Sequence, residues 1–227
     1  MALFGPPNIA ELVEKNDIKG LVKALHNKDL VIRKDAAEAL FKIGDPSSTE
    51  GFIDALKDED AGIRRLAAHA LGNFGDIQAI YPLIDALSDS DEQTRQNAAC
   101  ALGNVGNEIA EEPLKELLLR KKDDDLMQIA AESLSKLNAY RALVSVLKNT
   151  VSRGYVMDVL AQGGDRAVDP LVQALKDTNG EIRMIAAQVL GRIGSERALE
   201  PIRATLEIET FPAAREELEK TLKILGG

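Results

Sequence analysis

The sequence predicts an all-α fold of about seven stacked helix pairs. A twelve-residue pattern at 64–75 returns at 95–106, an offset of 31 residues. Apolar residues within each repeat follow helical spacing, not the alternation of a strand. A period of roughly 20 to 50 residues indicates supersecondary units that bury their apolar faces only against neighbouring units.

The second helix of each repeat has the clearest pattern. Ile63, Ala67, Leu71 and Phe74 are spaced by four, four and three residues, which places them on one helical face. A residue suited to an N-cap precedes this helix at Asp29, Asp60, Asp91 and Asn179. A glycine is expected to end it at Gly44, Gly75, Gly106, Gly164, Gly194 and Gly226, and Asn138 occupies the long gap.

The first helix of each repeat is shorter. Ile80, Leu83, Ile84 and Leu87 form its apolar face, and Pro82 lies in its early part, where a missing N–H is best tolerated. The proline recurs at Pro113, Pro170 and Pro201.

We expect a single domain over residues 1–227. A leading cap helix at 9–15 is followed by repeats at about 16–44, 45–75, 76–106, 107–138, 139–164, 165–194 and 195–226. Residues 120–164 are irregular, because one residue is inserted after Arg120 and the repeat at 139–164 is five residues short. This stretch should change the curvature or provide a softer joint.

The composition disfavours nucleic-acid-binding and membrane-spanning proteins. The chain has 45% hydrophobic and 29% charged residues, and its net charge is −9, which disfavours binding to nucleic acid. It has one cysteine and no apolar stretch approaching about 20 residues, the length of a membrane span. We therefore expect a monomeric cytosolic protein without a membrane or nucleic-acid partner.

The second-helix pattern, I/V-R-x-x-A-A-x-A-L-G-x-I/F/V-G, resembles the HEAT repeat of the PBS-lyase HEAT-like class over nearly the whole chain. The resemblance implies a right-handed α-α superhelix. It leaves the function open, because adaptor proteins, bilin-lyase subunits and a metal-dependent hydroxylase are similar.

Six repeats carry an arginine at one register, and a structural ladder is the favoured explanation over phosphate binding. Aspartates stand six residues before three of these arginines, giving the ladder residues Asp58, Arg64, Asp89, Arg95, Asp177 and Arg183. In similar HEAT proteins each guanidinium bridges carboxylates of its own and the adjacent repeat. We expect a weaker ladder where Asn27, Lys121 and Leu147 replace the aspartate.

Positions one, two, five and nine after each arginine lie opposite the apolar face, on what is the inner, concave wall in this class. The 24 such positions in the first six repeats, including Lys34 and Arg65, hold five basic and four acidic residues. A nearly neutral wall suits a protein partner. The candidate partner-binding residues are Leu66, His69, Asn73, Gln96, Asn97, Cys100, Asn104, Ile129, Tyr155, Met184, Ile185 and Arg192.

Two interpretations stay open for Leu66, Ile129, Tyr155, Met184 and Ile185. Exposed apolar residues that cluster mark an interaction site. Alternatively, scattered exposed apolar residues are ordinary, or the short repeat tilts these side chains into the core.

Nothing in the sequence demands catalysis, a metal or another cofactor. His69 and Cys100 share a register, but two ligands fall short of the three or four that zinc needs. The His-Glu pairs of the similar hydroxylase are missing. We expect a non-catalytic protein-binding scaffold; the alternative is a bilin-lyase-like protein handling a small ligand, with Tyr155, Met184, Ile185 and Arg192 as a partial chromophore site.

Overall fold

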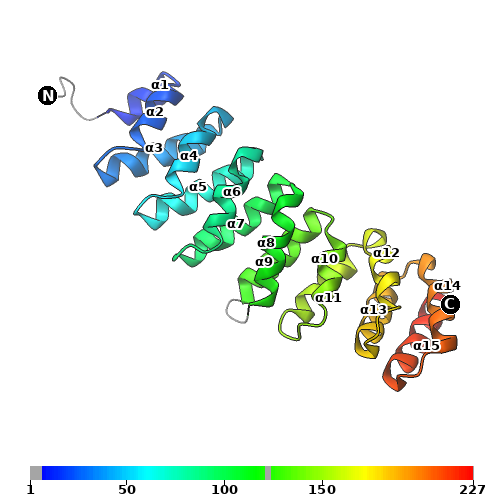
Figure 1. Ribbon diagram of the computed structural model, residues 1–227. Coiled ribbons are helices and arrows are strands. Elements are labelled where there is room, and N and C mark those ends of the chain that lie inside the picture. The colour runs from blue at the N-terminus through cyan, green and yellow to red at the C-terminus, as the bar shows by residue number, and fades with distance from the viewer. Residues whose placement is uncertain (1–6, 121–123, 227) are drawn as a thin grey trace. The chain divides into compact units, whose positions relative to one another are not determined.

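The computed structural model describes residues 7–120 and 124–226, and every regular element in them is helical, which confirms the predicted all-α fold. Consecutive helices pair as hairpins (Figure 1). The chain divides into two compact units, unit 1 (Met1–Ala110) and unit 2 (Glu111–Gly227).

Unit 1 begins with a short helix that packs on the first hairpin. Short 3-10 turns precede the first helices of the later hairpins. The elements are α1 (Ile9–Glu14), α2 (Ile18–Ala24), α3 (Leu30–Ile43), η1 (Pro46–Ser48), α4 (Thr49–Ala55), α5 (Ala61–Phe74), η2 (Ile77–Ala79), α6 (Ile80–Ala86), α7 (Glu92–Val105) and η3 (Glu108–Ala110).

Unit 2 contains four hairpins, of which the second has the shortest helices. Its elements are α8 (Glu111–Leu119), α9 (Asp124–Lys136), α10 (Tyr140–Ser145), α11 (Arg153–Gln162), α12 (Asp165–Ala174), α13 (Gly180–Ile193), η4 (Glu196–Ala198), α14 (Leu199–Ile208) and α15 (Pro212–Gly226). The predicted inserted stretch includes residues 121–123, which lie outside the described residues.

The regular second helices begin and end as their sequences predict. The carboxylates of Asp29, Asp60 and Asp91 accept N–H groups from the first turns of α3, α5 and α7. Each of these helices has 14 residues and ends at a glycine in the left-handed region, with φ near +70° at Gly75 and Gly106.

One of the predicted helix-ending glycines, Gly164, is wrong. α11 ends at Gln162, and Gly164 has φ +57° and ψ −138°, which is not the left-handed helical conformation, so it precedes α12 instead. The cause is the short connection, in which Gly163 lies against the ring of Tyr140. α15 ends at Gly226, the last described residue.

The prolines lie early in their helices, with one exception. Pro82, Pro113 and Pro201 are third residues of α6, α8 and α14, whereas Pro170 lies inside α12. α12 follows Gly164 directly, without a preceding 3-10 turn, so the same proline falls later in the helix.

The hairpins of unit 1 pack through small residues. A Cβ atom on Gly72 of α5 would lie 2.8 Å from both Cα and Cβ of Ala101 on α7. Only glycine permits this approach of the two second helices.

We predict that Gly72→Ala lowers the free energy of unfolding by about 1–3 kcal/mol, because the new methyl group overpacks the α5–α7 contact. Gly154→Ala is the matched control. Gly154 also lies in a second helix, and a Cβ there meets open space, so alanine should stabilise the protein by roughly 0.4–1 kcal/mol. Urea unfolding measures both, and equal effects would contradict the close helix approach.

Candidate functional site

A row of arginine–carboxylate contacts joins consecutive hairpins. In unit 1, Arg33 Nε donates to Asp58 Oδ2 at 2.8 Å, and Arg64 Nε donates to Asp89 Oδ2 at 2.8 Å. Each carboxylate lies in the loop that opens the next second helix. The contact therefore connects one hairpin to the following one.

Within its own hairpin, each arginine binds a main-chain carbonyl, so the predicted contact to that hairpin's carboxylate is wrong. Arg64 Nη1 donates to the Asp58 carbonyl at 2.9 Å, and Arg95 Nη1 donates to the Asp89 carbonyl at 3.0 Å. Carbonyls at the end of a first helix lack helical partners and accept these N–H groups. The aspartate side chain is thereby left for the preceding arginine.

The main-chain acceptor makes the side chain at this position unimportant for the repeat's own arginine. The carbonyls of Asn27 and Leu147 accept from Arg33 and Arg153, each at 3.0 Å, although neither residue is acidic. Lys121, the third predicted weak point, lies outside the described residues.

The side chains of this row are partly buried, so their contacts are expected to contribute to the stability of the fold. The side chains of Arg33 and Asp58 are 7% and 10% exposed. The hydrogen bond to Asp58 raises the pKa of Arg33. For Asp89, burial disfavours the charged form, but hydrogen bonds from Arg64 and the Asp91 main chain outweigh burial, and the pKa of Asp89 is lowered.

A second row of ion pairs lies beside the first, and sequence reasoning missed it. Lys34 Nζ lies 2.8 Å from Asp60 Oδ2, and Arg65 Nε donates to Asp91 Oδ2 at 2.7 Å. The hydrogen bonds from Lys34 and Arg65 lower the pKa of Asp60 and of Asp91. The signal was present, since a capping aspartate follows each of these basic residues by 26 positions.

The second-helix face of unit 1 is the candidate site. We define it by the exposed side chains of His69, Asn73 and Asn104 together with the half-buried Leu66, Gln96, Asn97 and Cys100. The His69 ring lies 5.0 Å from that of Phe41, and Asn97 Nδ2 donates to the Arg65 carbonyl at 2.9 Å. These contacts order the face from both sides.

The predicted apolar surface in unit 2 is partly buried. Ile129, Tyr155 and Met184 are half-buried, and Ile185 is 2% exposed. Placing Ile185 among the partner-binding residues was therefore wrong. Its helix, α13, packs against both α11 and α15, which cover it. Arg192 Nη2 donates to Asp158 Oδ1 at 2.7 Å.

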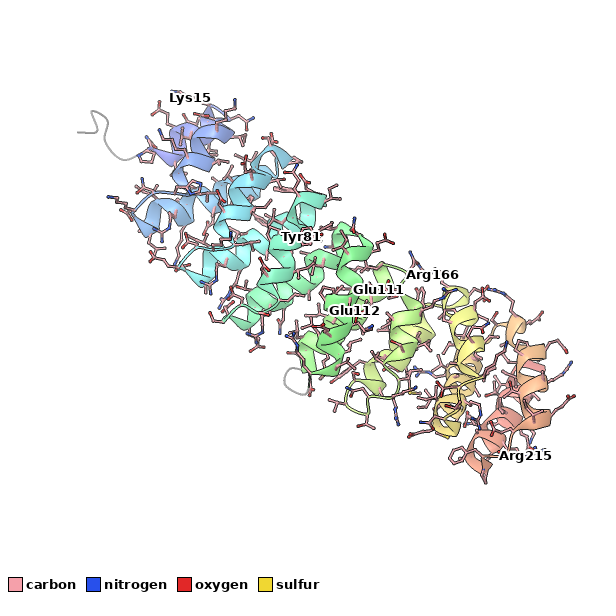
Figure 2. The ribbon with its side chains drawn as sticks, in the orientation of Figure 1. Lys15, Tyr81, Glu111, Glu112, Arg166 and Arg215 are labelled. Carbon is pink, nitrogen blue, oxygen red and sulfur yellow. The ribbon has the colours of Figure 1, made fainter. Side chains whose placement is uncertain are left out.

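The strongly exposed large apolar side chains of unit 1 include two on the first-helix side. Ile77 is 66% exposed, and Tyr81, labelled on α6 in Figure 2, is 67% exposed. Across residues 7–120 and 124–226, no three histidine, cysteine or acidic side chains gather as a metal site. No helix in this described part is long and apolar enough to cross a bilayer.

A comparison with known protein families identifies the repeat that carries these arginines and helix caps. The family model of HEAT repeats matches residues 49–135 and 139–223. The chain belongs to the HEAT-repeat family.

Solved structures share the HEAT fold at low sequence identity. The complex of CpcE and CpcF of phycocyanin lyase from Nostoc sp. PCC7120 matches with 22% identity, a TM-score of 0.55, and coverage of 99% of this chain and 97% of that one. An engineered protein matches with 21% identity, a TM-score of 0.51, and coverage of 96% and 70%. No curated protein sequence matches this chain.

The last HEAT repeat replaces the ladder aspartate by a glutamate one position later. Arg183 Nε and Nη2 donate to the two oxygens of Glu209, each at 2.6 Å. The Glu209 side chain is fully buried, and its Oε1 also accepts N–H groups from Thr210 and Phe211. The hydrogen bond from Arg183 lowers the pKa of Glu209 to about 2.

We predict that Asp89→Asn costs about 1–3 kcal/mol, because it weakens a charge-assisted contact on a partly buried arginine. The exposed Asp85 on α6 provides the control, and Asp85→Asn should change stability by less than about 0.5 kcal/mol. A double-mutant cycle with Arg64→Met, followed by urea unfolding, measures the coupling. A coupling energy near zero would show that the two side chains do not stabilise each other.

We predict that Glu209 makes the protein acid-sensitive. Its folded pKa of about 2 lies below the ordinary 4.5, so its stabilisation is complete above pH 4.5 and is lost as the pH falls toward 2. The full contribution is on the order of 3 kcal/mol. In Glu209→Gln, the urea midpoint should change less between pH 5 and pH 3 than it does in the exposed control variant Glu207→Gln. Parallel pH profiles for the two variants would contradict this assignment.

Proposed function

We propose that this HEAT-repeat protein is a non-catalytic, cytosolic scaffold that binds a protein partner on the second-helix face of unit 1. One observation carries the proposal. Lys34 and Arg65, which border this face, are held in ion pairs, while the side chains of His69 and Asn73 reach solvent.

Charge supports a protein partner over a nucleic acid. Residues 1–110 hold 11 lysines and arginines against 18 aspartates and glutamates, a net charge of −7. Lys34, Arg65 and Lys42, on the second helices that carry or border this face, are paired with Asp60, Asp91 and Glu38. Few positive charges are therefore left for phosphates, whereas amides and an imidazole can hydrogen-bond to a polypeptide.

Rigidity supports binding by a preformed surface. Two rows of ion pairs fix α5 against its neighbours, and Gly72 brings α5 and α7 into close contact. Side chains projecting from such a frame lose little conformational freedom on binding, which favours affinity.

One structural neighbour is a complex of two chains, CpcE and CpcF, and a protein partner for this chain is consistent with that assembly. The bilin-lyase-like alternative receives less support from the side chains. Ile185 lies in the core, and Arg192 is held by Asp158, so two of its four expected contacts are already engaged within the protein.

We predict that His69→Asp combined with Asn73→Asp abolishes retention of the partner in a pull-down from the native source, because two carboxylates enter a nearly neutral interface. The matched control, Gln78→Asp with Ser88→Asp, adds the same charge at exposed positions on the first-helix side of unit 1. Circular dichroism must show that both variants are folded.

Proteins kept by wild type and control but lost by the face variant support the proposal. Equal recovery with both variants, or equal loss, would overturn the assignment to this face. Pigment absorbing at long wavelength after co-expression with a bilin source would favour the lyase alternative.

A further inference from the structure

Unit 2 contains an apolar groove between the first helices α12 and α14. Its volume is about 710 Å³, and Val172, Leu175, Pro201, Ala204 and Ile208 form most of its apolar wall. The corresponding grooves between α2 and α4 and between α10 and α12 have volumes of about 240 Å³ and 230 Å³. The last groove is therefore about three times larger.

The sequence explains why this groove is large and apolar. Three residues after its proline, α14 carries Ala204, where α6 and α8 carry Asp85 and Glu116. Seven residues after its proline, α14 carries Ile208, where other repeats have the ladder aspartates Asp89 and Asp177.

The displaced ladder contact leaves Ile208 facing solvent. Because Glu209 supplies the carboxylate for Arg183, residue 208 is not needed for the ladder, and α14 continues through it. The Ile208 side chain is 79% exposed beside the groove.

The charged residues lining the groove are paired, with one exception. Arg183 is held by Glu209, and Glu200 accepts from Arg203 at 2.6 Å. Asp177 lies 3.7 Å from Lys148 and also accepts the main-chain N–H of Asn179. Lys176 is exposed, and its ammonium makes no ion pair with the described residues.

We propose that this groove binds a small apolar molecule with a single carboxylate, such as an acyl chain, in addition to the scaffold role of unit 1. The apolar part lies along Val172, Ala204 and Ile208, and the carboxylate pairs with Lys176. Pockets of roughly 300–1000 Å³ with apolar walls and few polar groups are typical of small-molecule sites. The single unpaired cation selects a carboxylate over an amine.

The length of the groove fits this ligand class. Glu200, Ala204 and Ile208 succeed one another along one side of α14, and the first and last are eight positions, or about 12 Å of helix, apart. Dodecanoate has a comparable length and offers one anionic end.

The experiment is calorimetric titration of the full chain with dodecanoate below its micelle concentration. Dodecyltrimethylammonium, with the same tail and the opposite charge, is the second probe. We expect saturable binding of one dodecanoate and weaker binding of the cation. Lys176→Glu should weaken dodecanoate binding by at least about tenfold, because it replaces the attraction by repulsion.

Ala204→Trp should abolish binding by filling the groove. The matched controls are Lys223→Glu and Ala213→Trp, both at exposed positions on α15, and they should leave binding unchanged. If Ala204→Trp unfolds, Ile208→Ser at the exposed rim takes its place and should weaken binding.

Three results would overturn the proposal: no saturable dodecanoate binding, equal binding of the cationic probe, or equal effects of groove and control variants. Each is independent of the pull-down that tests the face of unit 1, so failure of one proposal is distinguishable from failure of the other.

Discussion

The arrangement of hairpins within each unit depends on ladder arginines whose guanidinium groups each contact two consecutive hairpins. A ladder arginine binds the free carbonyls at the end of its own first helix and the carboxylate of the next hairpin, as Arg64 does with Asp58 and Asp89. Five directional N–H groups on a planar fork fix both partners at once. Because the carboxylate loop also opens the next second helix, the contact sets where that helix begins, and helix capping and hairpin stacking become one constraint.

Sequence reasoning succeeded where structure depends on local spacing. α5 begins after Asp60 and ends before Gly75 as expected, because N-caps and left-handed glycines act within one turn. It failed where the outcome depends on neighbouring hairpins. Ile185 is buried because α11 and α15 both cover α13, which no pattern within one repeat reveals. The second ion-pair row was missed for the same reason, since Arg65 finds its carboxylate in the next hairpin.

The row of arginines tolerates irregular spacing because the acceptor can change. The carboxylate follows its arginine by 25 residues at Asp89, by 28 at Glu181 and by 26 at Glu209. Both displaced acceptors are glutamates, whose extra methylene reaches further than an aspartate. The short repeat thus keeps a contact from Arg153 to Glu181 at 2.8 Å, and Met127, at the arginine register in the preceding repeat, is buried in the core.

The same constraint determines which side chains are left for binding. In unit 1 the two rows engage the charges and leave neutral groups such as Asn73 at the surface. In unit 2 Glu209 supplies the carboxylate that binds Arg183, so position 208 makes no ladder contact. An isoleucine at position 208 therefore leaves the ladder intact. Exposing that isoleucine to water is unfavourable unless something covers it. An apolar groove beside Lys176, whose ammonium makes no ion pair with the described residues, therefore follows from a one-residue shift in a structural contact.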